Sequence, residues 1–169
     1  MIGRLLLAAS AVALLSGCGL RPLYSGGARG TVATALRSVE VAPIPGRAGY
    51  LLRGSLVDQL GQSDGGEVRY RLEVELDDQI AGLGIRLDDA VTRERRTLRA
   101  RYRLVDARLG TVLLDATAGS DAGIDVVGSE YATVAAEQTA LERLSEMVAR
   151  QIVSRVGLYV SRTPAPAGQ

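Results

Sequence analysis

The segment 68–77 reads Val-Arg-Tyr-Arg-Leu-Glu-Val-Glu-Leu-Asp, so that apolar and charged residues alternate along its whole length. Successive side chains of a β-strand point to opposite faces of a sheet. Strict alternation is therefore typical of a strand with one face on a core and the other in water. The pattern predicts a strand from Val68 to Ile80, with its Arg, Glu and Asp side chains on the solvent side.

The same alternation returns twice further along the chain. It predicts a second strand over Arg95–Val105 and a third over Thr111–Ala118, with irregular connections over residues 81–90 and 120–128. Consecutive strands with short connections most simply form an antiparallel meander. The residues expected to face inward are Leu98, Ala100, Tyr102 and Leu104 of the second strand and Val112, Leu114, Ala116 and Ala118 of the third.

Amphipathic helices flank this meander. Leu36–Ile44 predicts a strand and Tyr50–Leu60 a short helix, while Glu130–Val156 predicts a long helix with Ser129 as its N-cap and Gly157 at its end. The element order is thus β-α-β-β-β-α. A sheet that is polar on one face needs cover on the other, so we predict an α+β fold: a two-layer sandwich in which two helices cover an antiparallel or mixed four-stranded sheet.

The N-terminus has the pattern of a lipoprotein signal. The short basic stretch Met1–Arg4 precedes an almost unbroken apolar run, Leu5–Leu15, which is too short for a membrane span of roughly 20 residues. The run leads into Leu15-Ser16-Gly17-Cys18, a lipobox. Cys18 is therefore expected to start the mature protein, with S-diacylglycerol on its sulfur and an N-acyl chain on its amino group. The alternatives are a plain secretory signal with a free thiol, or a cysteine buried in the core.

These features divide the chain into four parts. They are a signal peptide at 1–17, a lipidated N-terminus and tether at 18–34, the α+β domain at 35–160, and a disordered Pro- and Ala-rich tail at 161–169. Two or more acyl chains hold a protein firmly on a membrane. Gly19, directly after the cysteine, favours the outer membrane.

The composition excludes several classes of protein. The 169 residues include no His and one Cys, so Ser-His-Asp and Cys-His catalytic groups and the usual zinc sites cannot form once Cys18 is acylated. The net charge of +1 argues against a nucleic-acid-binding domain, which is usually clearly basic. We expect no enzyme, no metal, no nucleic-acid partner and no cofactor beyond the covalent lipid.

Three parts of the sequence together resemble the LPS-assembly lipoprotein family, LptE. They are Gly17-Cys18-Gly19-Leu20-Arg21-Pro22-Leu23-Tyr24, Val39-Glu40-Val41 before the Leu-rich helix, and the charged hairpin before the long helix. The resemblance covers essentially the whole mature chain. It implies a plug on the periplasmic side of an LptD-type outer-membrane β-barrel, which it helps to assemble and with which it moves lipopolysaccharide to the cell surface. The alternative is a periplasmic lipid-binding auxiliary lipoprotein of an ABC-type transporter.

Arginines supply the candidate contacts to lipopolysaccharide. Lipid A carries phosphates, and a guanidinium group pairs bidentately with phosphate. Arg93, Arg95 and Arg96 are the candidate contacts. The alternative for these residues is an exposed loop edge, where Arg discourages edge-to-edge pairing of sheets.

A second group of arginines alternates along the second predicted strand. Arg99, Arg101 and Arg103 can also reach a phosphate, but acidic residues of the preceding strand are ready partners for them. Opposite charges across neighbouring strands contribute roughly 0.2–1 kcal/mol each. We therefore favour a solvated strand face on which these arginines pair with Glu73, Glu75 and Asp77.

Overall fold

The computed structural model describes residues 30–61, 67–85, 91–126 and 128–163. Its elements follow the predicted order, with a helix added at the start. In chain order they are α2 (Thr31–Arg37), β1 (Val39–Val41), α3 (Gly46–Leu60), β2 (Tyr70–Ile85), β3 (Val91–Asp106), β4 (Val112–Asp125) and α4 (Glu130–Arg162).

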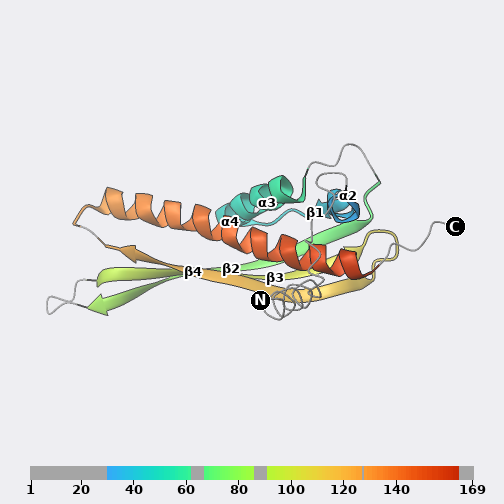
Figure 1. Ribbon diagram of the computed structural model, residues 1–169. Coiled ribbons are helices and arrows are strands. Elements are labelled where there is room, and N and C mark those ends of the chain that lie inside the picture. The colour runs from blue at the N-terminus through green and yellow to red at the C-terminus, as the bar shows by residue number, and fades with distance from the viewer. Residues whose placement is uncertain (1–29, 62–66, 86–90, 127, 164–169) are drawn as a thin grey trace, which may run out of the picture.

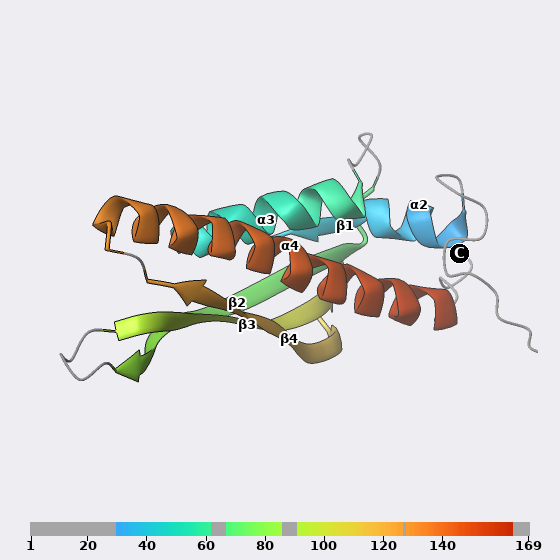
Figure 2. The ribbon, with the colours of Figure 1, turned by 60° about the vertical axis from the view of Figure 1, so that its left-hand side comes forward.

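The strands form one mixed sheet in the order β1-β2-β3-β4. β1 is parallel to β2, whereas β2, β3 and β4 form the predicted antiparallel meander. The helices α3 and α4 lie on one face of the sheet and leave the other face open (Figure 1 and Figure 2). The predicted α+β two-layer sandwich is therefore confirmed.

The core lies between the sheet and the helices. The β3 residues in it are those predicted to face inward, and none is more than 2% exposed: Leu98, Ala100, Tyr102 and Leu104. The helices contribute Leu52, Leu56 and Leu60 from α3 and Leu141, Leu144, Val148, Ile152 and Val156 from α4. Burying one large apolar side chain contributes about 1.5–3 kcal/mol. Burial of these stripes therefore holds both helices on this face.

The helix α4 runs along the whole sheet (Figure 1). Its 33 residues span about 50 Å at the rise of an α-helix. Ser129 occupies the predicted N-cap position, but its side chain makes no capping hydrogen bond. Gly157, the predicted end, is buried within the helix, which continues to Arg162. The packing around Gly157 outweighs the roughly 1 kcal/mol by which glycine disfavours a helix.

The predicted first strand, Leu36–Ile44, is longer than the observed one. β1 covers only Val39–Val41, and Leu36 belongs to α2, where it is 2% exposed. Val32, Ala35 and Leu36 have the i, i+3, i+4 spacing of a helix face and lie in or against the core. Because α2 packs on the core, residues 31–34, which were predicted to belong to the tether, are helical.

The helix α3 begins at Gly46, four residues before the predicted start at Tyr50. Gly49 makes this possible because it lies directly against the backbone of Ile44. A Cβ atom at Gly49 would come within 2.5 Å of the Ile44 carbonyl oxygen. The close approach requires glycine, although glycines so near each other are more typical of a turn.

The meander is longer than predicted because strands continue through segments expected to be irregular. β2 continues to Ile85, β3 begins at Val91, and β4 continues to Asp125. β3 pairs with a strand on each side along this extension. Backbone pairing satisfies the peptide groups whatever the side chains are, so the glycines of these segments do not end the strands.

Val112 also differs from the prediction. It was expected to face the core, yet it is 52% exposed. A register irregularity between Leu104 and Val105 places Val112 opposite Val105, while Leu114 lies opposite Leu104. An extra residue in one strand shifts side chains to the other face, since their period is two.

Candidate ligand-binding face

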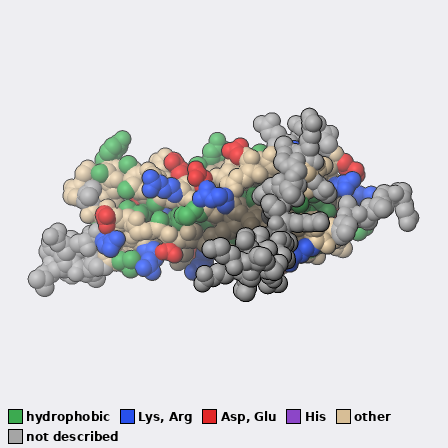
Figure 3. All heavy atoms as spheres, in the orientation of Figure 1, with side chains coloured by type: hydrophobic (Ala, Val, Ile, Leu, Met, Phe, Trp, Pro, Cys, Tyr) green, Lys and Arg blue, Asp and Glu red, His purple; other side chains and the backbone are tan. Residues whose placement is uncertain are grey.

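The open face of the sheet carries a central row of arginines from β3. They are Arg93, Arg95, Arg99, Arg101 and Arg103. The acidic residues of β2 lie beside this row in the predicted register, with Glu73 opposite Arg103, Glu75 opposite Arg101 and Asp77 opposite Arg99. Figure 3 shows acidic and basic side chains interspersed on the molecule, with no large patch of a single sign in this view.

Arg101 and Arg103 form ion pairs, as the favoured interpretation expected. Arg101 donates two hydrogen bonds to Asp115 of β4, one from Nε at 3.2 Å and one from Nη2 at 2.9 Å. These bonds lower the pKa of Asp115 and raise the pKa of Arg101. Arg103 lies 3.4 Å from Glu73 and 3.6 Å from Glu75. The partner of Arg101 is thus on β4, not on β2.

Arg93 and Arg95 lie on the same face, nearer the connection between β2 and β3. Nε of Arg93 is 3.1 Å from Oδ1 of Asp125, and Nε of Arg95 is 3.9 Å from Oδ2 of Asp121. All of these side chains are more than half exposed. Ion pairs in such exposed positions contribute about 0–1 kcal/mol. An anionic ligand can therefore compete with the carboxylates for either arginine.

Arg96 points to the helix-covered face, so the structure separates it from Arg93 and Arg95. It donates to Asp78 of β2 from Nε at 2.9 Å and from Nη2 at 2.6 Å, and its Nη1 donates to the Glu137 carbonyl of α4 at 3.0 Å. The hydrogen bond to Asp78 raises the pKa of Arg96, against the opposing effect of burial. This guanidinium joins β2, β3 and α4, and we call the arrangement the Arg96 clasp.

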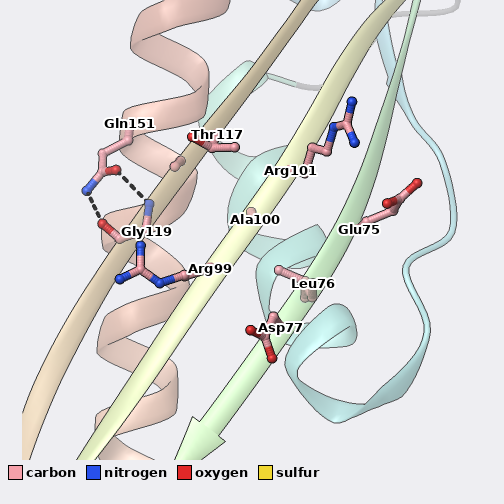
Figure 4. Close-up of a pocket in the computed structure, with 10 residues that line it drawn as sticks. Glu75, Leu76, Asp77, Arg99, Ala100, Arg101, Thr117, Gly119 and Gln151 are labelled. Carbon is pink, nitrogen blue, oxygen red and sulfur yellow. Dashed lines mark hydrogen bonds between the residues drawn. The ribbon is translucent and has the colours of Figure 1, made fainter.

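Arg99 was expected to pair with Asp77, like the other arginines of its group with their acidic neighbours, and this expectation is wrong. Although Asp77 is its partner in the register, no ion pair joins Arg99 to a carboxylate within the described ranges. Asp77 instead accepts hydrogen bonds of 3.1 Å from the Gln79 amide. Figure 4 shows Arg99 directed toward β4, where Gly119 lies opposite it. The glycine that lies opposite this arginine in the meander is the feature that could have indicated open space beside Arg99.

A hollow of about 520 Å³ lies on the open face around Arg99. Its polar lining comes from Glu75, Asp77, Arg99, Arg101, Thr117 and Gln151. Gln151 reaches it from α4 and is held at the edge of the sheet. The Gly119 N–H donates to Gln151 Oε1 at 3.1 Å, and Gln151 Nε2 donates to the Gly119 carbonyl at 3.2 Å (Figure 4). The hollow therefore has a wall that two hydrogen bonds fix in place.

Cys18, the predicted site of lipid attachment, lies outside the described residues. Within residues 30–61, 67–85, 91–126 and 128–163, no cluster of three or more His, Cys, Asp or Glu side chains is placed to hold a metal ion. None of the helices in those same ranges is both long enough and apolar enough to cross a membrane.

The mixed sheet, its long meander and the long C-terminal helix define a class of small α+β domains that occurs among bacterial lipoproteins. A proposed lipoprotein of Caulobacter crescentus is similar at 30% identity and a TM-score of 0.68, over 80% of this chain and 100% of that one. A minor lipoprotein of Acinetobacter baumannii shares the fold at 16% identity and a TM-score of 0.55, over 78% of this chain and 98% of its own. Lipoprotein B of Nitrosomonas europaea does so at 15% identity and a TM-score of 0.55, over 73% and 83%.

Within that class, a family model gives the assignment. The model described as LptE, Lipopolysaccharide-assembly, matches residues 36–156. The chain therefore belongs to the LptE family of lipopolysaccharide-assembly lipoproteins, and the resemblance inferred from its sequence is confirmed. A comparison with curated proteins found no significant match.

Proposed function

We propose that this protein is a lipid-anchored outer-membrane subunit that assembles with an LptD-type β-barrel and helps to insert lipopolysaccharide into the outer leaflet. The family match over residues 36–156 carries the proposal, because it extends from the end of α2 into the last third of α4. In this role the protein positions a partner and a lipid and carries out no reaction of its own.

The open face supports a place inside a barrel. Arginines alternate with carboxylates across β2, β3 and β4, so the face is polar along its length and its charges are largely paired within it. The interior of a wide outer-membrane barrel is also polar. Such a face can meet the barrel wall with water and hydrogen bonds, whereas an apolar face would need complete cover.

Lipid attachment at Cys18 is the second part of the proposal. The apolar run and the lipobox support removal of residues 1–17 and acylation of the new N-terminus. Mass spectrometry of the mature chain should find Cys18 at the N-terminus with S-diacylglycerol and an N-acyl chain. An unmodified thiol, or a precursor that still contains residues 1–17, would contradict this part.

Arg93 and Arg95 are the proposed contacts to the phosphates of lipopolysaccharide. Both are exposed and held only by surface ion pairs, so a phosphate can replace their carboxylate partners. Arg96, the third candidate, points to the opposite face, so a single ligand on the open face reaches only the other two. Charge reversal of Arg93 and Arg95 should weaken co-precipitation with lipopolysaccharide, whereas reversal of the exposed Arg150 on α4 should not. Equal binding by both variants would remove Arg93 and Arg95 from the proposal.

The decisive test of the function is purification of the tagged, full-length chain from outer membranes in mild detergent. We expect an LptD-type barrel to co-purify in a stable complex. A Cys18→Ala variant, which cannot carry the lipid anchor, is the control. If no such barrel is recovered, the proposal fails. Recovery of an inner-membrane ABC-type transporter would instead support the auxiliary-lipoprotein alternative.

A further inference from the structure

The hollow around Arg99 exists because β4 carries a glycine at the position beside this arginine. Gly119 has no side chain to fill the space, and the stem of Arg99 lies against it. A Cβ atom at Gly119 would come within 3.3 Å of Arg99 Cγ and 3.2 Å of the Leu98 carbonyl oxygen. The guanidinium is thus drawn toward β4 and away from Asp77, its neighbour on β2 (Figure 4).

The lining of the hollow contains two polar side chains that have no partner among the described residues, beside others that are already paired. Arg99 has no carboxylate partner among the described residues, and no hydrogen bond occupies the Thr117 hydroxyl in that part of the chain. Glu75, which lies 3.6 Å from Arg103, and Asp77, which accepts from the Gln79 amide, add carboxylate oxygens with further lone pairs from β2. One side of the hollow therefore attracts an anion, and the other side accepts hydrogen bonds from hydroxyl or amino groups.

The size and polarity of the hollow restrict what it can hold. Its 520 Å³ falls within the range of about 300–1,000 Å³ that is usual for small-molecule sites. A lone inorganic anion would leave most of this space empty and would face Glu75 and Asp77. An apolar ligand would leave the Arg99 guanidinium and the Thr117 hydroxyl unpaired. A sugar with an anionic substituent satisfies both sides, since its hydroxyls can donate to the carboxylates.

We propose that this hollow binds a saccharide unit bearing a phosphate or carboxylate group, with Arg99 anchoring the anion. The identity of the donor rests on the proposed function, because lipopolysaccharide would supply such a unit. The site is distinct from Arg93 and Arg95, which lie further along β3. Binding here would place the saccharide over the middle of the open face, beside the edge that Gln151 holds.

The test measures binding of the full-length chain in detergent to a lipid-free, phosphorylated oligosaccharide released from lipopolysaccharide, with a neutral oligosaccharide of equal length as the comparison. Wild type should bind only the anionic oligosaccharide. Arg99→Gln should weaken that binding about tenfold or more, as expected for loss of a charge-assisted contact. Arg71→Gln is the matched control, because it removes the same charge from the same face. Among the described residues Arg71 pairs only with Glu73, which is not part of the lining. Arg71 lies opposite Val105, six positions along β3 from Arg99 and so about 20 Å away, beyond the screening length of about 8 Å at physiological salt.

A second variant separates the hollow from the charge. Thr117→Tyr fills the space while leaving Arg99 intact, and it should also weaken binding, because strands accept aromatic residues readily. Equal binding by wild type, Arg99→Gln and Thr117→Tyr would overturn the proposal. If all three bind intact lipopolysaccharide equally and none binds the oligosaccharide, the site is refuted while the proposed function stands. If no barrel co-purifies but Arg99→Gln still loses the oligosaccharide, the site stands without that function.

Discussion

Removal of the Arg96 clasp should destabilise the fold far more than removal of a similar pair on the open face. Arg96 and Asp78 make two hydrogen bonds, as do Arg101 and Asp115, and each pair joins β3 to a neighbouring strand. The pairs differ in exposure. The side chains are 12% and 23% exposed in the first pair and 63% and 41% exposed in the second.

Burial determines the expected size of the effect. Breaking a fully buried ion pair costs 3–5 kcal/mol because a charge remains without a partner, whereas exposed pairs contribute about 0–1 kcal/mol. The clasp is partly reached by water, so we expect Asp78→Ala to lower the free energy of unfolding by about 2 kcal/mol, or roughly thirtyfold in the folding equilibrium. Arg96→Ala should cost about as much, because it also frees the Glu137 carbonyl.

A double-mutant cycle in urea measures the coupling within each pair. Arg96 and Asp78 should show a clear coupling energy, while the coupling of Arg101 and Asp115 should be barely resolved. Amide exchange in α4 before residue 137 should accelerate in Arg96→Ala, since the helix loses its link to the sheet there. Equal coupling in the two pairs would show that burial is not what makes the clasp strong.

Three further outcomes follow from individual contacts. Gly49→Ala should destabilise the fold by about 1–3 kcal/mol in urea unfolding, because its Cβ would meet the Ile44 carbonyl; unchanged stability would show that α3 can shift at no cost. Ser145→Ala should leave stability unchanged or raise it by about 1 kcal/mol, since the buried hydroxyl has no hydrogen-bond partner within the described ranges; a clear loss would reveal a partner for it. Arg101 lowers the pKa of Asp115 in the folded state. The ionised Asp115 therefore stabilises the fold at pH values above the usual Asp pKa of about 3.9. This stabilisation is lost as the pH falls from there through the lower pKa of the folded state. Asp115→Asn should make acid unfolding slightly less steep, and identical acid titrations would argue against the ion pair.

The period-two pattern predicted the faces of the β3 side chains from Leu98 to Leu104 correctly, because one face must be buried and a shift of one residue would expose every apolar group. Leu98 and Leu104 are fully buried for this reason. The same reasoning could not predict the register irregularity that exposes Val112. It also could not predict the ends of the strands, which depend on a neighbouring strand being present to pair with.

Side-chain partners were harder to predict than faces. Sequence reasoning placed Arg96 with Arg93 and Arg95, although alternation puts residue 96 on the side of Leu98 and away from its two neighbours. It also paired Arg99 with Asp77, whereas the geometry of β4 decides where that guanidinium lies. The position of Gln151 depends on how α4 crosses the sheet, and nothing in the local sequence indicates it.

Gln151 has a consequence for how copies of this chain behave when they are crowded. β4 is one of the two edge strands of the sheet, and an edge strand is a template on which another chain can continue the hydrogen-bonded ladder. At Gly119 the amide of Gln151 already supplies the donor and the acceptor that an incoming strand would bring. A strand from a second copy must break these two hydrogen bonds before it can pair with β4 at this position. The edge of the sheet therefore resists growth into a fibre.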